Sequence, residues 1–85
     1  MNEPDRARLA AVVRDALVDV APDLDPATIG DDDDFHDDLG LDSMDSLNLA
    51  VALYEATGVD VPERDYARMR TVAGCVAYLA SRLSG

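Results

Sequence analysis

The chain has 85 residues, which is enough for one small domain and too few for two separate hydrophobic cores. Hydrophobic residues make up 48% of it, with one Phe, three Tyr and no Trp, and a core of Leu, Val, Ala and Met favours an all-α domain over an aromatic-rich sandwich. Eighteen acidic residues against seven basic ones, all of them Arg, give a formal net charge of −11, which argues against nucleic acid or an anionic membrane as a partner and favours basic protein surfaces.

The first predicted element is an amphipathic helix over residues 5–20. Its apolar residues recur at spacings of three and four, as expected for one buried stripe. They are Leu9, Val12, Val13, Ala16, Leu17 and Val20. Pro22 is expected to end this helix, because a proline cannot continue the backbone hydrogen bonding.

Residues 21–42 show no sustained periodicity, and we predict a long ordered loop. Apolar side chains occur along it at intervals, as expected for a segment that crosses the core and is anchored there. They are Leu24, Ile29, Phe35 and Leu39. A helical turn is expected near residues 26–29, since Pro26 and Gly30 favour turns.

The second main helix is predicted over residues 43–57, with Gly58 as the residue that ends it. Its apolar residues form two stripes, which is more than one core face requires. One stripe is Met44, Leu47, Val51 and Tyr54, and the other is Leu49, Ala50, Leu53 and Ala56. Two interpretations stay open: a second face that meets a hydrophobic cargo or a partner, or the central helix of a bundle.

Two further helices complete the chain. A short one is predicted from Pro62 to Met69, and a last one follows Thr71, which suits its N-cap. The last helix has a regular apolar stripe of Val72, Cys75, Val76, Leu79 and Leu83. The predicted fold is therefore a four-helix bundle with three main helices, one short helix and a long ordered loop, in a single domain over residues 1–85.

The start of the second main helix carries a motif that closely resembles the acyl carrier protein family. That family has a Leu-Gly-x-Asp-Ser-(Leu or Met) run at this place, and the matching residues here are Leu39, Gly40, Asp42, Ser43 and Met44. The resemblance covers essentially the whole chain, because residues 59–63, 71–72 and 78–79 also resemble the family's segments around its last two helices.

The resemblance implies a carrier and not an enzyme. In that family a phosphopantetheinyl transferase, with Mg²⁺ and coenzyme A, attaches a 4′-phosphopantetheine arm to the motif serine, which is Ser43 in this chain. The terminal thiol of the arm holds acyl intermediates as thioesters for fatty-acid, polyketide or other specialised biosynthesis. The expected partners are this transferase and acyl-loading and acyl-processing enzymes with basic docking patches.

Physical chemistry is consistent with a phosphodiester on Ser43, because the N-terminus of a helix favours bound anions. The local sequence alone would equally allow Ser43 to be an ordinary N-cap, with Asp42 as a neighbouring candidate. A serine hydrolase is disfavoured, since His36 is the only imidazole and no Gly-x-Ser-x-Gly motif exists. We expect His36 to be a solvated loop residue.

Acidic and apolar residues near Ser43 suggest a docking surface for basic enzymes, which would approach by charge and then settle on Met44. The predicted contact residues are Asp37, Asp38, Asp42, Met44, Asp45, Leu47 and Glu55. The acidic run at residues 31–34 lacks the Gly and Glu of an EF-hand loop, so no metal site is predicted, although a weak divalent-ion site stays open.

The second main helix departs from the family where positions that are often acidic hold Asn48, Tyr54 and Ala56. This departure suggests a carrier with particular partners in a specialised pathway. The other two tyrosines, Tyr66 and Tyr78, are expected with Tyr54 at the edge of the core, without catalytic roles.

The remaining expectations concern location and assembly. Cys75 is alone, which excludes an intrachain disulfide, and its position on the last stripe predicts a buried thiol. The N-terminal residues carry charges throughout, unlike a signal peptide, and no segment approaches a membrane span. We therefore expect a cytoplasmic monomer that does not associate with membranes.

Two alternative functions stay open. A peptidyl or aminoacyl carrier would use the same arm, but such carriers usually have a Gly-Gly-(His or Asp)-Ser pattern, whereas residues 40–43 resemble the acyl type. The other alternative is an unmodified acidic interaction module of the same fold.

Overall fold

Helices form all the regular secondary structure of residues 3–84, the part of the chain that this computed structural model describes. The elements are α1 (Glu3–Val20), the 3₁₀ helix η1 (Pro26–Thr28), α2 (Ser43–Thr57), the 3₁₀ helix η2 (Glu63–Met69) and α3 (Val72–Ser84). The predicted all-α architecture, with three main helices, one short helix and a long loop, is confirmed. Among these residues, no helix combines the length and the apolar character needed to cross a membrane.

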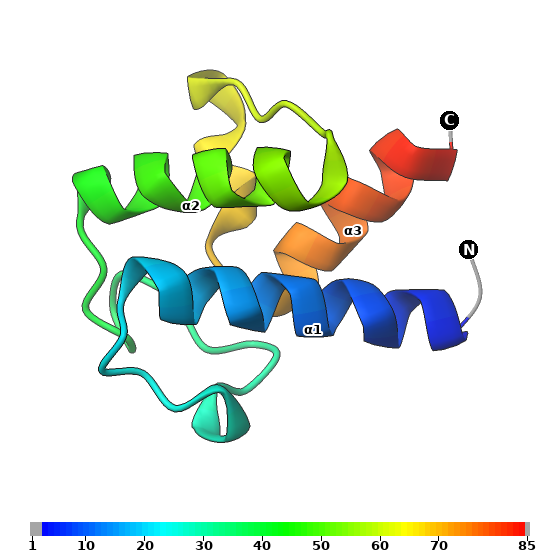
Figure 1. Cartoon of the computed structure of the whole chain (residues 1–85). Coiled ribbons are helices and arrows are strands. Elements are labelled where there is room, and N and C mark those ends of the chain that lie inside the picture. Colours follow the sequence, from blue (N-terminus) through cyan, green and yellow to red (C-terminus); the bar gives the residue numbers. More distant parts are fainter. Residues whose placement is uncertain (1–2, 85) are drawn as a thin grey trace.

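Helix α1 is packed against both other main helices, as Figure 1 shows, where α2 runs alongside it and α3 lies behind. Its buried stripe consists of Leu9, Val13, Ala16 and Leu17, and Val12 and Val20 pack at the margin of the core. Burial of a leucine or valine side chain contributes about 1.5–3 kcal/mol. The stripe that the sequence predicted thus holds α1 between α2 and α3.

The long loop is fixed by buried side chains and by hydrogen bonds to the end of η2 and the first turn of α3. Ile29 and Phe35 are buried as predicted, and Leu41 is buried although the sequence did not suggest it. The Phe35 amide donates to the Arg70 carbonyl (2.7 Å), and the Ala73 amide donates to the Asp31 carbonyl (2.9 Å). The loop is therefore ordered, and η1 is the predicted helical turn.

Helix α3 begins as predicted, with the Thr71 hydroxyl accepting a hydrogen bond from the Gly74 amide (2.9 Å). Gly74 also permits a close approach of η2, because a Cβ atom there would lie 2.6 Å from the Arg68 carbonyl oxygen. The predicted stripe is buried at Val72, Cys75, Val76 and Leu79. Leu83 is 47% exposed, contrary to prediction.

Tyr78 was expected at the core edge, and this was wrong, because it is among the largest fully buried side chains. Its hydroxyl donates to an Asp65 carboxylate oxygen (2.7 Å). The guanidinium groups of Arg68 and Arg82 lie 5.0 and 4.9 Å from its ring centroid. Since Asp65 and Arg68 belong to η2, these contacts attach η2 to α3 and supplement its few apolar anchors.

Candidate functional site

Asp42, and not Ser43, is the N-cap of α2. The Asp42 carboxylate accepts a hydrogen bond from the Asp45 amide (2.9 Å), and the Asp45 carboxylate accepts one from the Asp42 amide (3.1 Å). Together they form a complete capping box, in which each side chain binds the backbone of the other residue. The helix start is therefore stabilised without the side chain of Ser43.

Ser43 is the first residue of α2 and is exposed. Within residues 3–84 its hydroxyl makes no hydrogen bond. The preceding turn contains Gly40 at φ +76, a left-handed conformation that suits glycine, and the next residue, Leu41, is buried. After this turn the chain is anchored by the buried Leu41, and it then begins α2 with the hydroxyl of Ser43 accessible.

The acidic residues near Ser43 differ in their contacts. Asp42 and Asp45 are joined in the capping box, whereas Asp37 and Asp38 lie exposed on the preceding loop. Asp37 lies 3.7 Å from the Arg70 guanidinium, and Asp38 accepts a hydrogen bond from the Asp34 amide (2.7 Å). In the part of the chain that the structure describes, Asp37 and Asp38 therefore form no hydrogen bond with the capping pair of Asp42 and Asp45.

Arg70 forms a two-pronged ion pair with Asp34, in which Nε and one terminal nitrogen donate to the two carboxylate oxygens at 2.8 and 2.6 Å. The hydrogen bond from Arg70, together with one from the Asp37 amide, lowers the pKa of Asp34 from 3.8 to about 2. The same pair raises the pKa of Arg70. This pair links the acidic loop to the end of η2.

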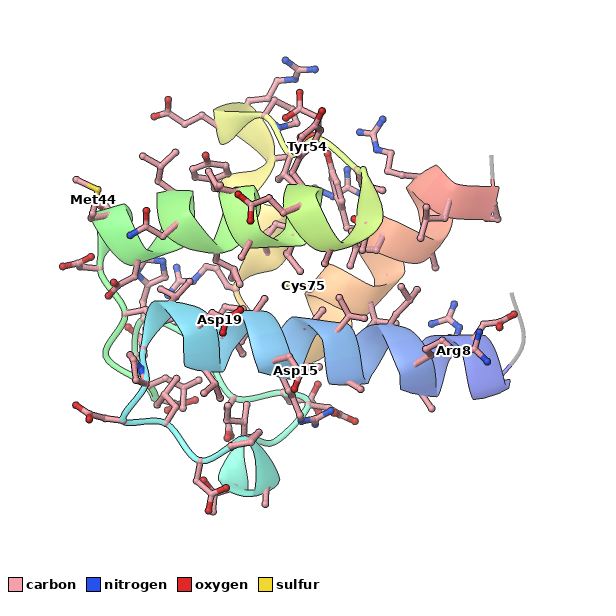
Figure 2. All side chains as sticks on the ribbon, in the orientation of Figure 1. Arg8, Asp15, Asp19, Met44, Tyr54 and Cys75 are labelled. Atoms are coloured by element: carbon pink, nitrogen blue, oxygen red, sulfur yellow. The ribbon has the colours of Figure 1, made fainter. Side chains whose placement is uncertain are left out.

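One face of α2 is apolar and exposed, and we call it the α2 apolar surface: Met44, Leu47, Val51 and Tyr54, with exposed fractions of 46–62%. In Figure 2, Met44 and Tyr54 lie near opposite ends of α2, away from α1. Leu49, Ala50 and Leu53 on the other face are buried. Ala56 was assigned to this inner stripe and is instead exposed, like Glu55 nearby. The surplus of apolar residues on α2 therefore forms a surface.

An open cleft lies between α2 and η2 beside Ser43, with a volume of about 460 Å³. Its lining residues are His36, Ser43, Ser46, Leu47, Glu63, Tyr66, Ala67 and Arg70. A second open hollow, of about 470 Å³, adjoins it through Leu47 and Tyr66 and reaches Tyr54. The cleft next to Ser43 thus continues along the α2 apolar surface.

His36 is half-buried and not simply solvated, which corrects the prediction from sequence. Its Nε2 lies 3.2 Å from the Ser46 hydroxyl, and that hydroxyl also donates to the Asp42 carbonyl (3.3 Å). Sequence reasoning missed Ser46, although its spacing of three from Ser43 places both on one side of the helix. The imidazole is paired with Ser46, and within residues 3–84 no general base is hydrogen-bonded to Ser43.

Cys75 and the acidic loop, the other candidates for a reactive group or an ion site, are engaged in structural contacts. Cys75 is fully buried, and desolvation raises the pKa of its thiol to about 12, so it is unreactive as a nucleophile. In the acidic loop, Asp31 pairs with Arg14, and Asp33 accepts a hydrogen bond from the Gly30 amide (2.8 Å). Within residues 3–84 no group of three His, Cys, Asp or Glu side chains is arranged to hold a metal ion.

Comparison with known proteins finds relatives of this chain in one family. A family model described as "Phosphopantetheine attachment site" matches residues 9–79. The chain is 34% identical over 80 residues to an acyl carrier protein of Streptomyces coelicolor, covering 94% of this chain and 87% of that protein. It is 36% identical over 63 residues to one of Rhodococcus erythropolis, covering 74% of this chain and 69% of that protein.

A eukaryotic relative also matches. The chain is 38% identical over 61 residues to the mitochondrial acyl carrier protein of Saccharomyces cerevisiae. This match covers 72% of the chain and 49% of the yeast protein, so the chain spans about half the length of that relative.

Proposed function

Because the chain belongs to the acyl carrier protein family, and so acts as a carrier and not as an enzyme, we propose that Ser43 is the residue that receives its phosphopantetheine arm. The cofactor of the family is phosphopantetheine, and when bound it supplies a thiol that holds acyl groups as thioesters. The observation that carries the assignment to Ser43 is its exposed hydroxyl, which the capping pair of Asp42 and Asp45 leaves unoccupied.

The residues around Ser43 suit a phosphodiester. The backbone N–H groups of Ser43 and Met44 belong to the first turn of α2, where no intrahelical partner exists. Since these groups point toward the N-terminal end of the helix, they favour a bound anion. Gly40 and the buried Leu41 fix the approach of the chain, so the hydroxyl stands where a modifying enzyme can reach it.

The partners that the family implies are modifying and acyl-processing enzymes. We propose that they contact this chain through the predicted docking residues, which are Asp37, Asp38, Asp42, Met44, Asp45, Leu47 and Glu55. Support comes from the α2 apolar surface beside Ser43, from the exposed carboxylates that precede Ser43 in the chain, and from the exposed Glu55 near the end of α2. Such a combination fits a partner whose apolar patch is surrounded by basic residues.

The attachment is tested by intact mass. After incubation with coenzyme A, Mg²⁺ and a broad-specificity phosphopantetheinyl transferase, the mass should rise by one phosphopantetheine unit. Ser43→Ala should abolish the rise, whereas Ser46→Ala, which changes the nearest serine on the same side of α2, should not. An unmodified wild-type chain, alongside a control carrier that is modified, would favour the unmodified interaction module instead.

The docking surface is tested with the same transferase as the partner. Met44→Ala should raise the KM for the carrier several-fold, because Met44 is 62% exposed directly beside Ser43. Leu83→Ala is the matched control, since Leu83 is also an exposed apolar residue but lies at the end of α3. Equal effects of both substitutions would argue against a docking role for Met44.

The pathway is a separate proposal. Asn48, Tyr54 and Ala56 reduce the negative charge of α2, and we propose a carrier for a specialised acyl pathway. Equal efficiency of the native chain with general fatty-acid enzymes would contradict this. Efficient loading with an amino acid by an adenylating enzyme would instead favour a peptidyl carrier.

A cytoplasmic, monomeric state is proposed as well. The single cysteine provides no intrachain disulfide, which suits a reducing compartment, and the net charge of −11 opposes self-association. Cell fractionation and sedimentation of the purified chain test these two points.

A further inference from the structure

Two nitrogen-bearing side chains from different parts of the chain line the cleft that contains Ser43. They are His36, from the long loop, and Arg70, from the end of η2. Three other arginines are engaged elsewhere: Arg14 contacts Ile29 and Asp31, and Arg68 and Arg82 lie over the Tyr78 ring. In the described part of this acidic protein, the cleft beside Ser43 therefore has its own pair of hydrogen-bond donors.

Arg70 is fixed in orientation and retains free donors. Its ion pair with Asp34 uses Nε and one N–H of one terminal nitrogen, out of the five N–H donors of a guanidinium. Its backbone is also fixed, because its carbonyl accepts the Phe35 amide (2.7 Å). The second terminal nitrogen has no hydrogen-bond partner within residues 3–84, and the side chain is 44% exposed. Asp34 thus orients Arg70 without using all of its donors.

His36 is held within one helical turn of Ser43. Ser43 and Ser46 are three residues apart on α2, a spacing at which Cβ atoms lie about 5–6 Å from each other. The Nε2 atom of His36 is 3.2 Å from the Ser46 hydroxyl. Because that hydroxyl has one proton and can give it to the Asp42 carbonyl, its oxygen can accept the His36 Nε2–H. An anion on Ser43 would thus lie within about one helical turn of this N–H, which would be shared between Ser46 and the anion.

We propose that His36 and Arg70 form a contact site for the phosphodiester on Ser43, a proposal that rests on Ser43 being the attachment residue. A phosphodiester adds a negative charge to the helix turn that already contains the Asp42 and Asp45 carboxylates, and these like charges repel one another. A guanidinium fork matches phosphate oxygens, and hydrogen bonds to a charged group are stronger than neutral ones. The two side chains thus offset the repulsion and direct the start of the arm into the cleft.

The test uses nuclear magnetic resonance on the intact chain before and after complete modification, with completeness established by mass. We expect the Arg70 side-chain Nε–H signal and the His36 ring signals to shift on modification. The Nε–H signal of Arg64 should stay in place, since Arg64 is exposed on η2 but does not line the cleft. The ³¹P resonance of the modified chain should move in Arg70→Gln and not in Arg64→Gln.

Arg70→Gln also breaks the ion pair with Asp34, so a second variant is needed. His36→Gln retains a hydrogen-bonding group for Ser46 and leaves the Arg70–Asp34 pair intact, and it should also move the ³¹P resonance. The contact site is contradicted if, in fully modified protein, the Arg70 and His36 signals do not shift and the ³¹P resonance is the same in His36→Gln as in wild type. This result would leave the assignment of Ser43 intact. A chain that gains no mass overturns instead the assignment of Ser43.

Discussion

At the start of α2, two adjacent residues that both suit a helix cap have different environments. The Asp42 carboxylate is bound to the Asp45 amide, while the Ser43 hydroxyl is exposed. The sequence could not decide between them, since Ser and Asp have nearly equal N-cap preferences. The backbone decides, because Asp42 is extended (φ −103, ψ −173) and the helix begins at the next residue.

The Arg70–Asp34 pair predicts a dependence of stability on pH. The pKa of Asp34 is depressed to about 2 from 3.8, so its stabilising contribution is present above pH 3.8 and is lost as the pH falls through about 2. We expect Asp34→Asn to be less stable than wild type at pH 5 and the difference to disappear near pH 2. The free energy of unfolding in urea, measured across this range, tests it.

Asp32→Asn is the matched control for this experiment, because it removes the same charge from the same loop, and Asp32 forms no ion pair within residues 3–84. A constant difference between Asp34→Asn and wild type from pH 5 to pH 2 would contradict the assigned role of the pair.

Among the helices, α2 has an inner and an outer face that differ in their expected contributions to stability. Leu53 is fully buried and Leu47 is 46% exposed. We expect Leu53→Ala to cost about 2–5 kcal/mol and Leu47→Ala less than about 0.5 kcal/mol. Because the substitution and the helix are the same, helix propensity cancels in the comparison. Urea unfolding of the two variants measures the difference, and similar losses would show that the outer face also supports the core.

The contact between η2 and α3 predicts that replacing a helical glycine by alanine lowers the stability of this protein instead of raising it. Gly→Ala inside a helix ordinarily stabilises by about 1 kcal/mol. At Gly74 the added Cβ would lie 2.6 Å from the Arg68 carbonyl oxygen, which belongs to the backbone and cannot move aside cheaply. We expect Gly74→Ala to destabilise on the order of 1–3 kcal/mol.

Thermal unfolding of Gly74→Ala tests this. Ala77→Gly, at an exposed position on the same helix, measures the effect of helix propensity without the close approach of η2. A rise in Tm for Gly74→Ala would show that η2 does not approach α3 this closely.

Periodicity predicted the bounds of α2 and the inner stripe of α1, because both depend on local spacing. It failed where burial depends on a distant partner. Tyr78 is enclosed because two arginines and Asp65 pack on it, and Leu83 continues the stripe beyond the end of the core. For the candidate site, the motif indicated Ser43, but the pairing of His36 with Ser46 joins two segments whose approach no local pattern encodes.

For the whole molecule, the net charge of −11 implies repulsion within the folded chain. Salt screens such repulsion beyond a Debye length of about 10 Å at 0.1 M, while surface ion pairs contribute little. We expect stability to increase from 10 to 200 mM NaCl by on the order of 1 kcal/mol, or about 4–8 °C in Tm. The increase should be smaller in a variant with Asp32→Asn and Asp60→Asn, and a decrease in the wild type would contradict this account.

The exposed ring of Tyr54 gives the α2 apolar surface an optical property. The chain has no tryptophan, so its near-ultraviolet emission comes from three tyrosines. Tyr78 is enclosed in the core and Tyr66 is half-buried, whereas Tyr54 is 53% exposed on the surface proposed to meet partners. An enzyme that covers this surface would change the emission of Tyr54 far more than that of Tyr78. The protein therefore contains its own fluorescent reporter of docking, and Tyr54→Phe removes that signal while keeping the aromatic ring.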